Sequence, residues 1–282
     1  MAATPPIVRL GAVSYLNTRP LVEGLDTRPD VALRFDVPAR CADLVEAGEV
    51  DLGLVPIIEY ARHADDYAIV PDVSIASRDA VDSVALFARQ PIERVRTIAL
   101  DVSSRTSAGL VRLLCARLWR IRPDFVPAAP DIGAMLASAD AALLIGDPAL
   151  FLDPASVDAH KIDLGLAWRE LTGLPFVWAV WAGRTGAASP EVCRLLLEAR
   201  RRGEASIDAI ARRERQDDPA AQALIARYLG ETITYGLDDA LQAGAQAYFD
   251  GLAGEGIIPR APRLRMFAGP AGAVGGPAAP VR

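Results

Sequence analysis

The stretch IVRLGAVSYLNTRPL, residues 7–21, joins an apolar strand pattern to a polar loop. Residues 7–13 are apolar apart from one arginine, which predicts a buried strand. The loop that follows is rich in hydrogen-bonding side chains, namely Ser14, Tyr15, Asn17, Thr18 and Arg19. Pro20 fixes its own φ and disfavours a helical residue before it, so we expect an extended loop and a helix that begins at residue 20 or 21.

Further strand patterns alternate with helical patterns over the first two thirds of the chain. The predicted strands are residues 7–13, 31–37, 50–56, 83–89, 95–101, 123–129, 141–146 and 176–183. Predicted helices between them include residues 41–49, 107–120 and 131–138. Because the strands are almost continuously apolar, this alternation predicts an α/β fold with parallel sheets covered on both faces.

After residue 188 the patterns are helical only, over residues 189–214, 218–231 and 236–256. Extended segments at 83–97 and 173–183 join the two α/β blocks, which favours two lobes over one long sheet. Lobe I then comprises residues 1–91 and 177–266, and lobe II is the insert 92–176. A ligand cleft is expected between them. The Gly/Pro/Ala-rich segment 267–282 shows no periodicity and predicts a disordered tail.

The charge composition argues against a nucleic-acid partner. The 282 residues have a formal net charge of −6, and Lys161 is the one lysine, so no dense basic face is expected. An anionic ligand would have to be bound by local arginines and backbone amides, because the overall field repels it.

Cysteine and histidine usage argues against a disulfide framework or a metal site. Cys41, Cys115 and Cys193 are far apart, and we expect them to be buried and reduced. Because His63 and His160 are the two histidines, a histidine-based metal site is not expected. The N-terminus lacks an apolar signal-peptide core, and no uncharged stretch reaches the ~20 residues that span a bilayer. These patterns predict a cytoplasmic protein with no membrane partner.

Ligands of α/β sheets bind beyond the carboxyl ends of the strands, so the residues after each strand are the candidate site. After the first strand, Asn17 either contacts a ligand or braces the turn while Thr18 caps the next helix. After residues 95–101, four hydroxyl side chains and one arginine crowd a helix start: Ser103, Ser104, Arg105, Thr106 and Ser107. This cluster predicts a carboxylate or phosphate site, and a plain N-cap would need only one hydroxyl.

Two further strand ends carry candidates. Gly146 allows a ligand to approach the backbone, and Asp147 is the expected cap of a short helix at Pro148. Glu59 follows the strand 50–56 and is either an acid or base in the cleft or a solvated side chain. Ser83 faces the cleft if the two-lobe arrangement holds. No nucleophile triad, P-loop or GxGxxG motif is present.

In order, several of these motifs resemble the chorismate dehydratases of the futalosine route to menaquinone, over residues 7–258. The motifs are VSYLNTRPL (13–21), LVPIIEY (54–60), DSVALFAR (82–89), DVSSRTS (101–107), LLIGDPAL (143–150) and DLGLAWRELTGLPFVWAVW (163–181). The resemblance implies a type II periplasmic-binding-protein-like fold with a two-stranded hinge and an interlobe cleft. It also implies conversion of chorismate to 3-[(1-carboxyvinyl)oxy]benzoate and water, without metal or organic cofactor.

The resemblance places Asn17, Ser83 and residues 103–107 in ligand-binding motifs. We hypothesise that the enolpyruvyl carboxylate of the substrate takes the C3 proton while Asn17 and Ser83 align it. Glu59 is the alternative base. The expected substrate-binding residues are Ser14, Tyr15, Thr18, Arg19, Ser103, Ser104, Arg105, Thr106, Ser107, Gly146 and Asp147.

Two other functions compete with the dehydratase. The fold also suits a non-catalytic binding protein for a small aromatic or cyclic carboxylate. The missing export signal argues against this alternative. The fold suits the ligand-sensing domain of a regulator as well, but no helix-turn-helix segment precedes the fold. The sequence leaves monomer and homodimer open.

Overall fold

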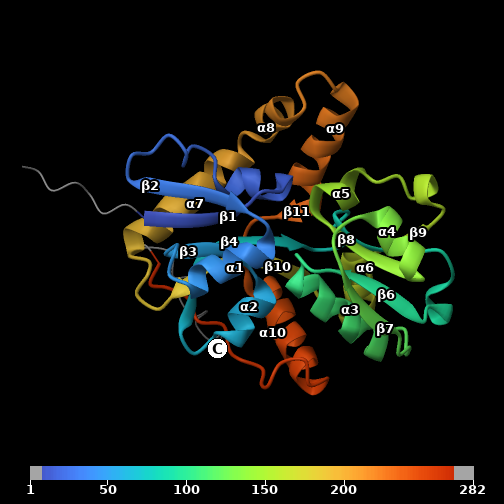
Figure 1. Ribbon diagram of the computed structural model, residues 1–282. Coiled ribbons are helices and arrows are strands. Elements are labelled where there is room, and N and C mark those ends of the chain that lie inside the picture. The colour runs from blue at the N-terminus through green and yellow to red at the C-terminus, as the bar shows by residue number, and fades with distance from the viewer. Residues whose placement is uncertain (1–7, 270–282) are drawn as a thin grey trace, which may run out of the picture.

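The protein has two lobes, each built around one β-sheet, in a computed structural model that describes residues 8–269 (Figure 1). The predicted tail from residue 270 onwards lies outside the described residues. The lobe I sheet has the order β11-β4-β10-β3-β1-β2 and the lobe II sheet the order β7-β6-β8-β5-β9. The strands of lobe I are β1 Val8–Val13, β2 Val31–Asp36, β3 Leu52–Pro56, β4 Tyr67–Ser77, β10 Phe176–Arg184 and β11 Ile233–Thr234. Those of lobe II are β5 Val84–Ala88, β6 Thr97–Asp101, β7 Asp124–Ala128, β8 Ala141–Ile145 and β9 His160–Asp163.

The helices cover both sheets. Lobe I carries α1 Pro38–Glu46, α2 Ile57–Arg62, α7 Pro190–Glu204, α8 Ile207–Glu214, α9 Pro219–Arg227 and α10 Asp239–Gly254. Lobe II carries α3 Arg105–Arg117, α4 Ile132–Ser138, α5 Gly146–Phe151 and α6 Leu164–Thr172. Short 3-10 helices are η1 Leu16–Leu21, η2 Ile92–Arg94 and η3 Pro154–Val157, and η4 Tyr228–Thr232 is a π-helix. The helix predicted over 189–214 is therefore two helices, α7 and α8.

The predicted pair of lobes is present, but the outgoing connection lies elsewhere. The chain leaves lobe I after Ser77 at the end of β4, and β5 already belongs to the lobe II sheet. It returns at Phe176, the first residue of β10, which is the register partner of Ser77. The two crossing segments, 78–83 and 173–175, therefore leave neighbouring strands and form a two-stranded hinge. Lobe II begins before residue 84 rather than at 92, and 83–97 is not the connection.

The sequence patterns do not predict strand β4, because a proline and an aspartate interrupt its apolar run. Asp72 follows Pro71 and has a left-handed φ of 57°. The pairing of β4 with β10 shifts register across this point, between Ile69 and Ser74. Such a bulge lets a strand tolerate Pro and a left-handed residue in its middle.

Both sheets are mixed, whereas the sequence predicted parallel sheets. β1 runs parallel to β2 and β3, and β6 runs parallel to β7 and β8. β10 and β5 run antiparallel to their neighbours. They are the strands by which the chain enters each sheet from the hinge, so they run against strands whose carboxyl ends face the hinge.

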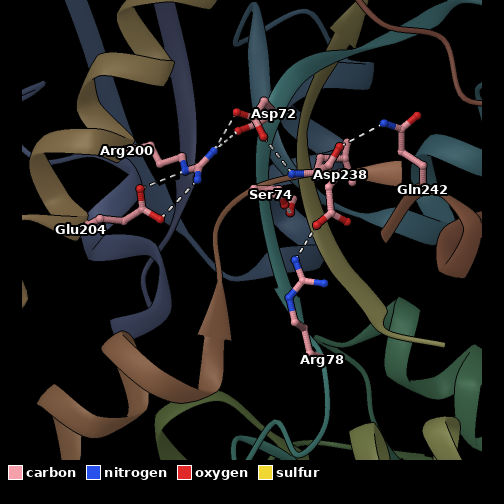
Figure 2. Close-up of polar contacts among 9 residues, drawn as sticks. Asp72, Ser74, Arg78, Arg200, Glu204, Asp238 and Gln242 are labelled. Atoms are coloured by element: carbon pink, nitrogen blue, oxygen red, sulfur yellow. Dashed lines mark hydrogen bonds and ion pairs between the residues drawn. The ribbon is translucent and has the colours of Figure 1, made fainter. Parts of the chain in front are cut away.

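Polar contacts fix the bulged strand β4 between α7 and α10 (Figure 2). The guanidinium of Arg200 on α7 donates to the backbone oxygen of Asp72 at 2.6 Å and pairs with its carboxylate at 3.0 Å. Glu204 holds the same guanidinium from one turn further along α7. The carboxylate of Asp72 also accepts from the amide of Leu237, which leads into α10. Directly after the end of β4, Arg78 pairs with Asp238, the N-cap of α10. Strand β4, which leads into the hinge, is therefore held in place by contacts with α7 and with the start of α10.

The three cysteines, Cys41, Cys115 and Cys193, are buried and free, as predicted. Burial raises the pKa of the Cys41 thiol to about 12, so it stays protonated at neutral pH. Over residues 8–269, none of the helices has the length and apolarity needed to cross a membrane.

Candidate active site

A cavity lies between the lobes where the carboxyl ends of β1, β3 and β8 meet the start of α3, and it has about 490 Å³ of empty space when the open solvent at its mouth is included. Both lobes contribute to its wall. The lining residues are Val13, Tyr15, Asn17, Pro38, Pro56, Ile75, Ser83, Val84, Ser104, Thr106, Ser107, Ile145, Gly146, Trp178 and Ala179. The wall is thus largely apolar, with a few convergent hydroxyl and amide groups, as is common in small-molecule sites.

Half of the residues singled out from the sequence line this cavity. These are Tyr15, Asn17, Ser83, Ser104, Thr106, Ser107 and Gly146. The structure places the other candidates outside the lining: Ser14, Thr18, Arg19, Glu59, Ser103, Arg105 and Asp147. The strand ends therefore meet at one place, but many of their polar side chains do not line the cavity.

The N-terminus of α3 forms part of the cavity wall. Ser104 is the N-cap residue, and its side chain makes no capping hydrogen bond. The first amides of a helix have no partner within the helix, so those at the start of α3 are free to bind an anion. The hydroxyls of Ser104 and Ser107 lie beside them in the lining. The Thr106 hydroxyl donates to the Trp178 backbone oxygen at 3.3 Å and thereby holds α3 against β10.

Arg105 does not line the cavity and instead links the two lobes. Its guanidinium, on α3 of lobe II, pairs with Asp43 on α1 at 2.7 Å and with Glu59 on α2 at 3.3 Å. Glu59 is 5% exposed and also pairs with Arg62. The Arg105 guanidinium is therefore occupied by protein carboxylates, the start of α3 offers the cavity only amides and hydroxyls, and Glu59 lies outside the cavity wall.

Arg19 and Asp147 also have protein partners. Arg19 Nε lies 3.0 Å from Glu214 Oε1 on α8. The Asp147 carboxylate accepts from the amide of Leu16 at 3.0 Å, which joins α5 of lobe II to η1 of lobe I. Burial raises the pKa of Asp147. Asp147 is thus an interlobe contact rather than the expected cap of α5, which has no side-chain cap.

The remaining three candidates lie away from the cavity wall. Ser14 is exposed, and Thr18 is fully buried in η1. Ser103 donates its hydroxyl to Asp101 at 2.7 Å. The helix after the first strand starts at Leu16, not at residue 20 or 21, because a tight 3-10 turn accommodates Pro20 inside it.

Gly146 and Tyr15 form a close contact across the cleft. Gly146 has a left-handed φ of 68°, and a Cβ there would lie 2.7 Å from Tyr15 ring atoms. Glycine is needed for both reasons, since other residues strain at this φ and their Cβ would overlap the ring.

Two residues of the site gave no clear sequence signal. Trp178 lines the cavity, although the predicted strand 176–183 does not mark it as a site residue. The hydroxyl of Tyr228, buried in η4, accepts from Asn17 Nδ2 at 3.2 Å and donates to Ser83 Oγ at 2.7 Å. Nothing near residue 228 in the sequence marks this role, because its partners lie 211 and 145 residues away.

Comparison with known proteins agrees with this geometry. The family model described as menaquinone biosynthesis matches residues 8–253. The chain belongs to this family. A curated relative from Thermus thermophilus, named chorismate dehydratase, is 30% identical over 259 residues, which are 86% of this chain and 94% of the relative.

Solved structures confirm the predicted fold class of this family member. A protein from Archaeoglobus fulgidus superposes with a TM-score of 0.72 at 18% identity, covering 89% of this chain and 98% of that one. The periplasmic aliphatic sulphonate binding protein of Escherichia coli superposes with a TM-score of 0.67 at 17% identity, covering 99% and 97%. The periplasmic-binding-protein-like architecture is thus established.

Proposed function

We propose that the protein is a chorismate dehydratase, which converts chorismate to 3-[(1-carboxyvinyl)oxy]benzoate and water. The observation that carries the proposal is membership of the menaquinone biosynthesis family together with the similarity to the Thermus thermophilus dehydratase. The cavity supports it, since free helix amides and hydroxyls suit a small carboxylate and apolar walls suit its ring.

The reaction needs stabilisation of an anion more than a strong catalytic group. The ring carboxylate acidifies the C3 proton through the conjugated ring, and loss of the C4 hydroxyl makes the ring aromatic. Negative charge accumulates on the ring carboxylate between these two steps. We assign that carboxylate to the start of α3, where helix amides without side-chain caps lie beside Ser104 and Ser107 in the cavity wall.

We infer that the enolpyruvyl carboxylate of the substrate takes the C3 proton, which then leaves with the C4 hydroxyl as water. Among the lining residues described, Tyr15 alone has a titratable side chain, and burial raises its pKa, which disfavours the phenolate that would act as a base. Asn17 and Ser83 lie in the same wall and would align the two substrate groups. The reaction is redox neutral, so we propose that it proceeds without a cofactor.

Closure of the lobes would complete the site. The Leu16–Asp147 and Arg105–Asp43 contacts already join the two lobes in this structure. Excluding water from the cavity strengthens each hydrogen bond to the developing anion.

The proposal is tested by incubating the purified protein with chorismate and following the aromatic enol ether by liquid chromatography and mass spectrometry. We expect a product lighter than chorismate by one water, formed at a rate proportional to enzyme concentration. Variants Asn17→Ala and Ser83→Ala serve as controls and should be slower. Binding of chorismate by calorimetry without turnover would contradict the proposal and support a non-catalytic binding protein.

A further inference from the structure

The buried tyrosines of this protein differ in what their hydroxyls contact. The hydroxyls of Tyr60 and Tyr248 donate to the backbone oxygens of Arg263 and Thr106. The hydroxyl of Tyr235 is buried and has no hydrogen-bond partner in the described chain. The hydroxyl of Tyr228 bonds to side chains instead, and both of them line the cavity.

The geometry points to Tyr228 as a positioning residue that orients Asn17 and Ser83 toward the substrate. This inference rests on the proposed function. Tyr228 is 1% exposed and absent from the cavity wall, so it acts through its two partners. Through these two hydrogen bonds, Tyr228 connects η1 of lobe I with the hinge segment that enters lobe II.

A single hydroxyl proton determines what each partner offers to a ligand. Tyr228 donates that proton to Ser83 Oγ, so the Ser83 hydroxyl keeps its own proton free to donate into the cavity. Asn17 directs Nδ2 to Tyr228, and its Oδ1 is buried with no hydrogen-bond partner among residues 8–269. Both residues line the cavity, so Ser83 would offer a donor, which suits a carboxylate oxygen, and Asn17 would offer its unpaired Oδ1 as an acceptor, which suits the C4 hydroxyl.

The backbone before Ser83 is held independently, so the hydroxyl of Tyr228 acts on the Ser83 side chain. Asp82 has a left-handed φ of 59°, and its amide donates to Asp163 at 2.7 Å. Lys161 donates to the Asp82 backbone oxygen at 2.6 Å. Residues held in such conformations cluster at functional sites, as do π-helices such as η4.

The test compares Tyr228→Phe with Tyr235→Phe, which removes an unpartnered hydroxyl from an equally buried ring. We expect Tyr228→Phe to lower kcat about 10- to 100-fold, because Asn17 and Ser83 lose their common partner, while KM changes less. Tyr235→Phe should keep the wild-type kcat. Thermal unfolding of both variants shows whether they fold. A kcat of Tyr228→Phe within about threefold of Tyr235→Phe would overturn the inference.

A double-mutant cycle separates positioning from a purely structural effect. In an Asn17→Ala, Ser83→Ala background, Tyr228→Phe should change kcat by less than about threefold, because its two targets are gone. A loss as large as in the wild-type background would contradict positioning.

A crystal structure of Tyr228→Phe gives a readout that does not depend on turnover. We expect the Asn17 amide or the Ser83 hydroxyl to rotate away from its wild-type orientation, and unchanged orientations of both would refute the inference. If the wild-type protein does not convert chorismate, the proposed function fails, and this structural comparison still decides the role of Tyr228.

Discussion

Gly146→Ala should interfere with lobe closure through one added methyl group. Gly146 belongs to lobe II and Tyr15 to lobe I, and the added Cβ would lie 2.7 Å from three ring carbons. Ordinary contact begins at 3.4 Å, so the two residues must separate by about 0.7 Å. The neighbouring Leu16–Asp147 hydrogen bond, now 3.0 Å, would lengthen to about 3.7 Å if the lobes parted by that amount, which is beyond hydrogen-bond range.

The free-energy change has two parts that a matched control separates. A left-handed alanine is strained by about 1–2 kcal/mol, and this strain applies at Gly48 as well. Gly48 has a φ of 70° against 68° at Gly146, and its Cβ would have no neighbour within 4 Å. The overlap with Tyr15 adds about 1–3 kcal/mol, which an open lobe arrangement relieves. The ratio of closed to open molecules should therefore fall about 5- to 150-fold in Gly146→Ala alone.

The assay measures kcat/KM on chorismate and the free energy of unfolding in urea for both variants. Both should unfold more easily by about 1–2 kcal/mol, and only Gly146→Ala should lose kcat/KM as well, by up to the factor given above. In a Tyr15→Ala background the Gly146→Ala substitution should lose that additional effect, since the overlapping ring is gone. Equal kcat/KM for Gly146→Ala and Gly48→Ala would refute the reasoning.

Three further predictions concern charged groups. Arg105→Gln should raise KM about 5- to 20-fold with a smaller change in kcat, because the ion pairs to Asp43 and Glu59 hold the lobes together, and an unchanged KM would contradict this. Glu59→Gln should lower the free energy of unfolding by about 1–3 kcal/mol and lower kcat by less than about tenfold, whereas a loss of several orders of magnitude with intact binding would identify Glu59 as the base. Hydrogen bonds from the backbone amides of residues 96 and 97 lower the pKa of the Asp140 carboxyl. The carboxylate should therefore stabilise the fold at neutral pH, and this stabilisation should be lost as the pH falls through the lowered pKa. In urea titrations, Asp140→Asn should lower the free energy of unfolding at pH about 7 and much less at pH about 3.

Sequence patterns locate the strand ends of this fold better than the strands that form its hinge. The tips that carry Asn17, Ser104 and Gly146 follow continuous apolar runs, and parallel strands bring such tips to one edge. Strand β4 is interrupted by Pro71 and Asp72, and its pairing with β10 is long-range, so no local pattern shows it. The hinge boundary was misplaced for the same reason.

The hydrogen-bond and ion-pair partners of side chains could not be predicted from the sequence, for a different reason. A polar cluster at a strand end predicts hydrogen bonding, but it does not say whether the partner is a ligand or another part of the chain. Arg105, Arg19 and Asp147 all stand in such clusters and all have protein partners. Tyr228 is the converse case, because it belongs to no motif and yet contacts two cavity residues.

The use of Arg105 between the lobes, rather than in the cavity, bears on how an anion is bound and released. A guanidinium inside the cavity would attract chorismate and its product alike, since both carry two carboxylates, and would slow release of the product. Helix amides act most strongly when water is excluded, so their effect depends on closure. The ion pairs of Arg105 with Asp43 and Glu59 favour closure without touching the ligand. On the proposed assignment, binding strength can then rise when the lobes close and fall when they open, so the amides proposed to stabilise the reacting anion would not retain the product.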